Sequence, residues 1–460
     1  MQGLDIILAA IYYLIALVAV IHVVMDNRQP AKTMAWALVI WFVPFVGIIF
    51  YIFFGVNTRK ERLVSKRSLD ELTKRTMLRH QPFETSAIDI YTSGKTFFQA
   101  LLSTIAEARH HVHINMYIFE DDPLGNSITD ALIAMAREGV SVRVIYDDVG
   151  CWNVPHRFFD YMREEGIEVV PFLPVRFPSF TSKVNYRNHR KIIVIDGQVG
   201  FIGGMNIAQR YATDTWRDTM LRVTGSAVST LQQAFLIDWY FVDRTLINDR
   251  QYYPAINASN AGATTPDATM PANLDGHIEQ LHTVTSGPDS PLPEIMQGFV
   301  RIITGARRYL YIQTPYFLPN EPVLFALKSA VAAGIDVRIM VPLNNDSWFV
   351  DWAGRSYLRE MAETGARVEL YTAGFLHSKL LVCDDEVCTC GSANVDFRSF
   401  ENNFEANAFI HGQQTALRMK TIFFDDEQQT KDLTDLPQRM HPRFFVRLFE
   451  GIVRLLAPLM

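Results

Sequence analysis

The feature that most restricts how this 460-residue chain can fold is a motif that occurs twice with the same internal spacing. The pattern H-x-K-x4-D-x6-G-[GS]-x-N starts at His189 and starts again at His377. A single histidine on a strand is usually structural, but two sets with identical spacing are much harder to explain that way. The duplication therefore predicts one functional site built from two copies of the same domain.

The segments that precede each motif repeat as well. Residues 112–119 and 139–146 have the composition of strands, and residues 128–137 between them have helical spacing. Their second copies are residues 309–316, 334–341 and 323–331. Strands that alternate with helices are joined by right-handed crossovers into a sheet covered by helices. We therefore predict an α/β protein with two pseudo-symmetric domains, each a mixed sheet flanked by helices, that share one active site.

Strand geometry explains the spacing within the motif. Side chains alternate between the two faces of a strand, so His189 projects with Lys191, and His377 projects with Lys379. The pair Asp196-Gly197 is typical of a hairpin turn, after which the chain returns and brings the glycine and asparagine of the motif beside the histidine. We expect the two His-Lys pairs to face each other across one cleft.

Two histidines, two lysines and two asparagines without evident metal ligands suit the transfer of a phosphodiester. One imidazole can attack phosphorus, while the other protonates the leaving alkoxide and then activates the acceptor alcohol. Lysine ammoniums and asparagine amides can bind the non-bridging oxygens as charge develops. Carboxylates can fix the imidazole tautomers, and the sequence leaves open which carboxylate supports which histidine. The predicted catalytic residues are His189, Lys191, Asp196, His377, Lys379 and Asp384, the predicted phosphate-binding residues are Gly204, Asn206, Ser392 and Asn394, and we expect no metal and no cofactor.

The first 55 residues contain two long apolar stretches. Residues 4–25 hold only Asp5 and His22 as groups that can carry a charge near neutral pH, and residues 34–55 hold no charge. As a helix, each stretch would extend ~33 Å, enough to cross a bilayer core of about 30 Å. The short connection 26–33 predicts a two-helix transmembrane hairpin. The run of basic residues between positions 59 and 67 places the rest of the chain in the cytoplasm.

Composition limits the class of protein further. With 49% hydrophobic and 20% charged residues the chain is globular rather than disordered. A net charge of −6 argues against a dedicated nucleic-acid binder, and four cysteines suit a reducing compartment. The predicted parts are a hairpin (1–58), a basic juxtamembrane linker (59–85), a first domain (86–254), a flexible Ala/Thr/Asn/Pro-rich linker (255–276), a second domain (277–430) and a C-terminal amphipathic helix (440–460).

The C-terminal segment has a distinct charge pattern. Arg443, Arg447, Glu450 and Arg454 fall on one stripe of a helix, and apolar residues cover the rest. Such a helix can lie in the membrane interface. It can equally pack on the catalytic body or on a partner, and both interpretations stay open.

Three smaller groups of residues receive simpler interpretations. We read the histidines at 110, 111 and 113 as a solvated helix end, because they lack metal-ligand spacing with other ligands. Cys388 and Cys390 are read as small buried strand residues. The approach to the first motif is locally basic and suits an anionic headgroup, although a solvated loop is an equal alternative for the residues before Asn188. These basic residues are Arg176, Lys183, Arg187, Arg190 and Lys191.

The doubled motif resembles that of the phospholipase D superfamily. Over nearly its whole length, the chain resembles the bacterial cardiolipin synthase family within that superfamily. The residues that carry the resemblance are segments 185–191, 314–317, 374–379, 391–401 and 403–405, together with Arg28-Gln-Pro30, Ala35-Trp36 and Phe54-Gly-Val-Asn57 in the N-terminal part. Two mild departures are the linker 255–276 and Met220, which stands where we expect a histidine in relatives.

The resemblance implies transfer of a phosphatidyl group through a phosphohistidine from one phosphatidylglycerol to another, giving cardiolipin and glycerol without a metal. It implies His189 as the nucleophile and His377 as the acid and base, although the internal symmetry leaves that assignment open. A membrane-bound phospholipase D or phosphodiesterase that hydrolyses phospholipids is the alternative. A nuclease and a non-catalytic membrane scaffold are less well supported. The expected partners are phosphatidylglycerol, other anionic phospholipids and the bilayer of the bacterial inner membrane, with no nucleic acid, and a homo-oligomer is compatible with the sequence.

Overall fold

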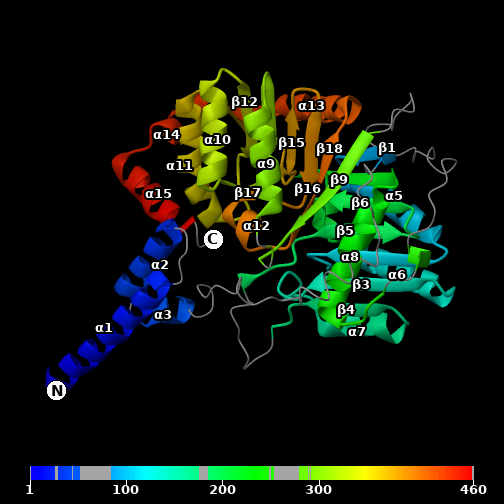
Figure 1. Ribbon diagram of the computed structural model, residues 1–460, viewed down its shortest axis with the longest axis horizontal. Helices are drawn as coiled ribbons and strands as arrows, with labels where there is room; N and C mark the ends of the chain where they lie inside the picture. Colours follow the sequence, from blue (N-terminus) through cyan, green and yellow to red (C-terminus); the bar gives the residue numbers. More distant parts are fainter. Residues whose placement is uncertain are drawn as a thin grey trace.

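A computed structural model describes residues 2–25, 30–43, 45–51, 84–175, 185–247, 250–252, 279–288, 290 and 292–457 of the chain. Figure 1 shows two α/β halves side by side, with an N-terminal helical hairpin that projects from the second half. The predicted linker 255–276 lies outside the described residues, as does the predicted basic linker up to residue 83.

The first half follows the predicted order of strands and helices. The helix predicted at 128–137 begins earlier, at Pro123, because the Asp122 side chain accepts a hydrogen bond from Gly125 N and caps the first turn. The elements are β1 (Glu84–Tyr91), α5 (Gly94–Ala106), β2 (His111–Met116), α6 (Pro123–Arg137), β3 (Ser141–Asp147), α7 (His156–Glu164), β4 (Glu168–Phe172), β5 (Lys191–Ile195), β6 (Val199–Gly203), β7 (Trp216–Arg217), β8 (Met220–Gly225) and α8 (Val228–Asp243).

The second half repeats this plan and ends in two further helices. Its elements are β9 (Glu279–Ser286), α9 (Glu294–Gly305), β10 (Tyr309–Gln313), β11 (Phe317–Leu318), α10 (Glu321–Ala332), β12 (Asp336–Pro342), α11 (Trp348–Thr364), β13 (Arg367–Tyr371), β14 (Phe375–Leu376), β15 (Leu380–Cys383), β16 (Val387–Gly391), β17 (Val395–Asp396), α12 (Phe397–Glu401), β18 (Glu405–His411), α13 (Gln413–Glu427), β19 (Thr430–Asp432), α14 (Pro437–Met440) and α15 (Phe444–Leu456).

Strand pairing confirms a mixed sheet with two equivalent halves. The order across the described strands is β19-β13-β12-β10-β15-β16-β18-β9 for the second half, continued by β1-β8-β6-β5-β2-β3-β4 for the first. In both halves three parallel strands are followed by an antiparallel hairpin that carries the motif, as in β2-β3-β4 with β5-β6. The two halves join through the antiparallel pair β1 and β9.

The apolar core also joins the halves. One cluster of buried side chains draws on both motif hairpins, with Ile192 and Val194 from β5 and Leu380 and Val382 from β15. Because each hairpin buries one face against the other half, the residues at the ends of β5 and β15 are brought close together. The buried cysteines Cys388 and Cys390 lie on β16 in this cluster, as predicted.

The N-terminal hairpin differs in two respects from the prediction. Helix α1 (Gln2–Met25) covers the first apolar stretch, but the second stretch is not one helix: it is divided into α2 (Pro30–Phe42) and α3 (Val46–Phe50). Phe45, directly before α3, has a positive φ of 60°, which is incompatible with a continuous right-handed helix. Within the described part of the chain, no helix combines the length and the apolar character needed to cross a membrane.

The histidines at 110–113 do not form a solvated helix end, so that interpretation is wrong. His111 and His113 lie on β2 and are fully buried. Gln232 of α8 hydrogen-bonds to both rings, and His113 stacks on Phe235 with the ring centroids 4.3 Å apart. Burial lowers the pKa of His111 to about 4 and holds that of His113 well below its usual value. They are neutral core residues that connect the sheet to α8.

Candidate active site

The two motif histidines lie in equivalent positions, and each is held by the backbone of the other half. The N–H of His189 donates to Phe404 O at 2.8 Å, and the N–H of His377 donates to Arg217 O at 2.7 Å. The segments before the histidines pair in parallel with the same partners, as a bridge between Asn188 and Phe404 and as the short strands β14 and β7. Neither histidine can therefore be positioned by its own half alone.

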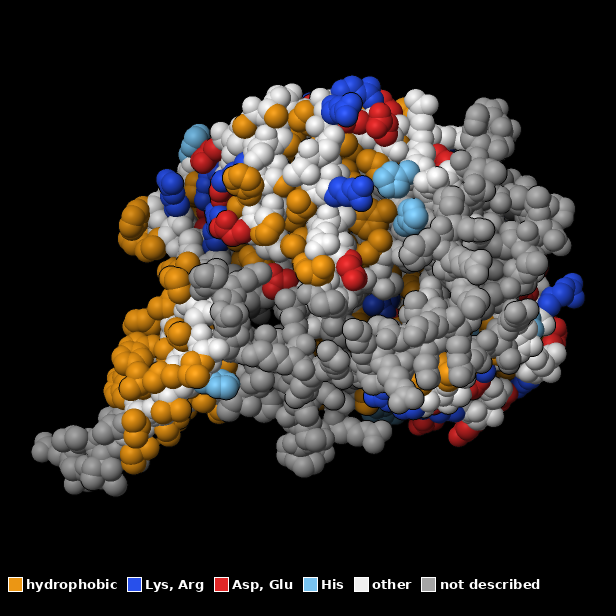
Figure 2. All heavy atoms as spheres, in the orientation of Figure 1, with side chains coloured by type: hydrophobic (Ala, Val, Ile, Leu, Met, Phe, Trp, Pro, Cys, Tyr) orange, Lys and Arg blue, Asp and Glu red, His pale blue; other side chains and the backbone are white. Residues whose placement is uncertain are grey.

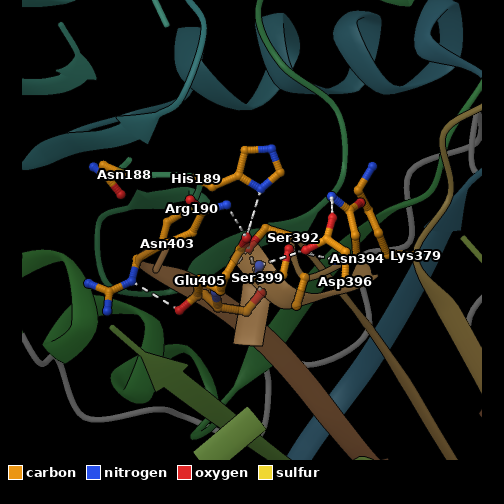
Figure 3. A network of polar contacts seen from close by, with 12 residues as sticks. Asn188, His189, Arg190, Lys379, Ser392, Asn394, Asp396, Ser399, Asn403 and Glu405 are labelled. Carbon is orange, nitrogen blue, oxygen red and sulfur yellow. Dashed lines mark hydrogen bonds and ion pairs between the residues drawn. The ribbon is translucent and has the colours of Figure 1, made fainter. Parts of the chain in front are cut away.

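Each imidazole meets a buried carboxylate that also comes from the other half. His189 Nδ1 lies 3.0 Å from both carboxylate oxygens of Glu405, and His377 Nδ1 lies 2.6 Å from Asp218 Oδ2. Figure 3 shows His189 directed at Glu405 from above. With Nδ1 occupied, Nε2 is the nitrogen that remains for chemistry. The sequence left these partners open, although Asp218 follows His189 by 29 residues and Glu405 follows His377 by 28.

The second residue of the G-[GS] pair in each motif, Gly204 or Ser392, contacts one of these carboxylates. Ser392 Oγ donates to Glu405 Oε2 at 2.5 Å. At the equivalent position in the first half, Gly204 lies so close to Asp218 that a Cβ would overlap the carboxylate. Both residues were predicted to bind phosphate. The structure places both against the carboxylates: Ser392 donates its hydrogen bond to Glu405, and Gly204 leaves the space that Asp218 occupies.

The motif lysines lie fully buried beside the histidines. Lys191 Nζ donates to His189 O at 2.7 Å, and Lys379 Nζ donates to His377 O at 2.5 Å. Lys379 Nζ also lies 2.8 Å from His377 Nδ1. Two ammoniums thus accompany the two carboxylates, Glu405 and Asp218, and the group is close to neutral when all four are ionised.

Burial dominates the electrostatics of this group. It lowers the pKa of His189 to about 4, and together with the Lys379 charge it lowers the pKa of His377 to about 3. It also lowers the pKa of Lys191 to about 7 and that of Lys379 to about 8.

Burial alone would raise the pKa of each carboxylate, but the lysines and histidines outweigh it, so Glu405 and Asp218 both have lowered pKa values. Without a bound anion, both imidazoles are neutral at pH 7, and each can act as a nucleophile.

The asparagines and histidines open onto one cleft of about 500 Å³ between the halves. His189, His377, Asn206 and Asn394 all line it. Asn206 is oriented by a hydrogen bond from Ile118 N at 3.1 Å, and Asn394 Nδ2 donates to Asp396 Oδ2 at 3.2 Å. The two motifs therefore meet at one cleft, as predicted.

Of the predicted catalytic residues, the two histidines line the cleft and the two lysines lie buried beside them, whereas Asp196 and Asp384 lie at the far ends of their strands. Asp196 accepts the backbone N–H groups of residues 109–111 at 2.8 to 2.9 Å. Asp384 does the same for residues 307–309 at 2.7 to 2.9 Å. Each sits at the hairpin turn with a positive φ, 54° and 56°, at the opposite end of the strand from the lysine. Their position corrects the prediction: they fix the turn and the start of the neighbouring strand.

Arg176 and Lys183 of the predicted basic approach lie outside the described residues. Arg190 is buried in an ion pair with Asp238, whereas Arg187 lines the cleft. Among the residues that the structure describes, no group of three or more His, Cys, Asp or Glu is arranged to hold a metal ion.

Gly204→Ala is expected to lower turnover by about 100-fold or more. The added methyl group has no space beside the Asp218 carboxylate, so the acid must move away from His377 Nδ1, and an imidazole held in the wrong orientation loses most of its catalytic effect. Gly305→Ala is the control, because a Cβ there meets nothing within 4 Å. Steady-state turnover of both purified variants is the measurement. Equal activity of the two would show that the close approach of Gly204 and Asp218 is not needed.

Comparison with known proteins finds two family models that match the chain. The family described as "Cardiolipin synthase, PLD-like domain" matches residues 101–239 and 299–426, which contain the two motifs. The family described as "Phospholipase_D-nuclease N-terminal" matches residues 14–55.

Full-length relatives extend the likeness over the whole chain. The cardiolipin synthase of Alkalihalophilus pseudofirmus is 36% identical, covering 98% of this chain and 94% of that protein. The major cardiolipin synthase ClsA of Bacillus subtilis is 35% identical, covering 99% of both. Among solved structures, the phosphatidylserine synthase of Haemophilus influenzae has a TM-score of 0.64 at 16% identity and covers 84% of this chain and 100% of that one. This last likeness concerns the fold.

Proposed function

The chain belongs to the cardiolipin synthases of the phospholipase D superfamily, and from this premise we propose how its cleft transfers a phosphatidyl group. It is a phosphatidyltransferase that makes cardiolipin from phosphatidylglycerol. The observation that carries the mechanism is the crossed pairing of each motif histidine with a carboxylate of the other half.

In the first step, Nε2 of one histidine attacks the phosphorus of a phosphatidylglycerol. The P–N bond forms as the P–O bond to the headgroup glycerol breaks, and the other imidazole, protonated, gives its proton to the leaving oxygen. Both imidazoles are neutral in the free protein, so the anionic phosphate is what stabilises a proton on the second ring. We propose His189 as the nucleophile and His377 as the acid.

In the second step, the primary hydroxyl of another phosphatidylglycerol replaces glycerol. The second imidazole, now neutral, takes the proton of that hydroxyl, the new P–O bond forms, and the P–N bond breaks. The products are cardiolipin and the free histidine. We propose that the amides of Asn206 and Asn394 bind the non-bridging oxygens, and that the buried Lys191 and Lys379 offset the negative charge from beside the histidines.

Purified protein incubated with phosphatidylglycerol vesicles and no added metal tests this function. Cardiolipin with an equal amount of glycerol is the expected result. Phosphatidic acid as the sole lipid product would identify a hydrolase, because water would then be the acceptor.

We propose that the hairpin α1–α3 is embedded in the bacterial inner membrane and that both halves lie on its cytoplasmic side. The described outer surface of the hairpin is apolar, with Leu14, Val18 and Phe42 all more than half exposed, and Figure 2 shows hydrophobic side chains gathered over it. Helix α2 alone would extend ~20 Å, so a second crossing would need α3 as well. The basic residues between 59 and 67 support the orientation.

Helix α15 supports the same arrangement. The C-terminal part of its polar stripe faces the protein, because Glu450 is buried and pairs with Arg359 of α11 at 2.5 Å, and Arg454 pairs with Glu360 at 2.6 Å. Arg443 and Arg447, at the start of the stripe, are exposed. Its apolar face points outward, with Phe444 72% and Phe445 79% exposed. The helix contacts α2, and Ala457 just after it lines the cleft. We propose that α15 lies in the membrane interface and that lipids enter the cleft beside it.

A dye attached at position 445 is expected to report the membrane. The four native cysteines are buried, so Phe445→Cys offers one exposed thiol for an environment-sensitive fluorophore. In vesicles that contain phosphatidylglycerol its emission should shift to the blue, because the label enters the acyl region. Leu292→Cys, an exposed position far along the chain from α15, is the matched control and should not shift. An unshifted emission from the label at position 445 would contradict the proposal that α15 lies in the membrane interface.

A further inference from the structure

The cleft is not symmetric, although the motifs that form it are. Arg398 stands four residues after Asn394, and Arg210 stands four residues after Asn206, so the two arginines are equivalent in the repeat. Both line the cleft. Arg210 is neutralised, because its guanidinium pairs with Glu120 at 2.5 Å, whereas no ion pair joins Arg398 to a carboxylate within the described part of the chain.

A second arginine adds to this difference. Arg187 lies two residues before His189 and also lines the cleft, and the equivalent position before His377 is Phe375. The cleft wall on the His189 side therefore carries two guanidiniums. On the other side the ring of His377 is surrounded by aromatic rings, with Trp216 at 5.4 Å and Phe375 at 5.7 Å between centroids.

Within the part of the chain that the structure describes, each of the two guanidiniums uses only a minority of its N–H donors. Toward the described residues, Arg187 donates one hydrogen bond of 2.9 Å, to the adjacent Tyr186 O. Arg398 donates to Asn185 O at 2.8 Å and to Asn185 Oδ1 at 3.2 Å. Each guanidinium has five N–H donors. Burial and the charge of Arg398 both lower the pKa of Arg187, and the buried carboxylate of Asp147 offsets this without forming an ion pair with it.

Two close cations without a bound anion are an unfavourable arrangement that a phosphate would relieve. The reacting phosphate already has the duplicated set of histidines, asparagines and lysines, which is the same on both sides. The two arginines lie on one side only, so they suit a group that is present on one side only. When cardiolipin forms, the acceptor lipid provides such a group, because it brings a phosphodiester of its own that does not react.

We propose that Arg187 and Arg398 form a binding site for this second, non-reacting phosphodiester and thereby select an anionic lipid as the acceptor. The inference rests on the proposed function and specifies the substrate of its second step. A neutral alcohol that attacks the same phosphohistidine does not need the site.

The test compares two acceptors on one enzyme. Full-length protein in phosphatidylglycerol vesicles with labelled glycerol performs two reactions through the same intermediate: cardiolipin formation, and exchange of labelled glycerol into phosphatidylglycerol. For Arg187→Gln we expect cardiolipin formation to fall about tenfold or more, and exchange to stay within about twofold. Arg187→Lys should recover part of the loss. Arg157→Gln, an exposed arginine on α7, controls for the loss of one positive charge and should leave both rates unchanged.

Arg398→Gln should give the same split, but Arg398 also connects the halves through Asn185, so its melting temperature must be measured alongside. Equal loss of both reactions in Arg187→Gln would overturn the proposal, because the arginines would then serve the reacting phosphate. Unchanged cardiolipin formation would overturn it too. A wild-type protein that releases only phosphatidic acid would instead contradict the proposed function itself.

Discussion

His189→Ala and His377→Ala are each expected to lower cardiolipin formation by at least about three orders of magnitude, as is usual when a nucleophile or its paired acid is removed. Both rings line the same cleft, and each is fixed by a carboxylate and a backbone carbonyl of the opposite half. Because the two imidazoles act in one sequence of steps, the double variant should be little worse than either single one. Cardiolipin formed from phosphatidylglycerol vesicles under steady-state conditions is the measurement.

Trapping the intermediate assigns the two roles. Rapid quenching after addition of phosphatidylglycerol labelled at phosphorus should leave label on the wild-type chain as an acid-labile phosphoramidate. With His189 as the nucleophile, His189→Ala should carry no label. His156→Ala, at an exposed histidine on α7, should behave as wild type. Near-normal turnover in either active-site variant would contradict the two-histidine mechanism.

The fold could be predicted from the sequence because the same pattern of strands and helices occurs in both halves. The strands expected at 139–146 and 334–341 are β3 and β12, shifted by no more than two residues at either end. The hairpin expected at Asp196-Gly197 is also present, with positive φ at both residues. The local sequence pattern gave the wrong environment for His111 and His113. Their burial depends on α8, which contacts them from more than a hundred residues later in the chain.

The candidate site could be predicted in part for a similar reason. The histidines were found because they belong to the repeated motif, but their carboxylates belong to the other copy and are joined to them only by the pairing of the halves. For Asp196, the length of the strand is a sequence signal that places it away from the reacting phosphate. Five residues of strand separate it from Lys191 by ~16 Å, too far for both to serve one phosphate. Spacing identified the motif, and only strand length shows which of its members reach the cleft.

Glu405→Gln and Asp218→Asn are expected to lower turnover by about 100-fold or more, although each changes only one oxygen to an amide nitrogen. The carboxylate accepts the Nδ1–H and so leaves Nε2 to face phosphorus, whereas an amide can donate to Nδ1 and favour the wrong tautomer. Glu363→Gln removes an exposed carboxylate of α11 and should leave turnover unchanged. Rates within threefold of wild type in both active-site variants would show that the crossed pairs do not act in catalysis.

The pH profile separates the two carboxylates. Each one raises the pKa of its histidine against the effect of burial, so its removal lowers that pKa further. An acid must hold its proton, so the profile of Asp218→Asn should shift toward lower pH, and acidification should recover part of its activity. A nucleophile must be neutral, and a lower pKa only extends the range in which His189 is neutral. Glu405→Gln should therefore gain nothing from acidification. The opposite pattern would exchange the roles of His189 and His377.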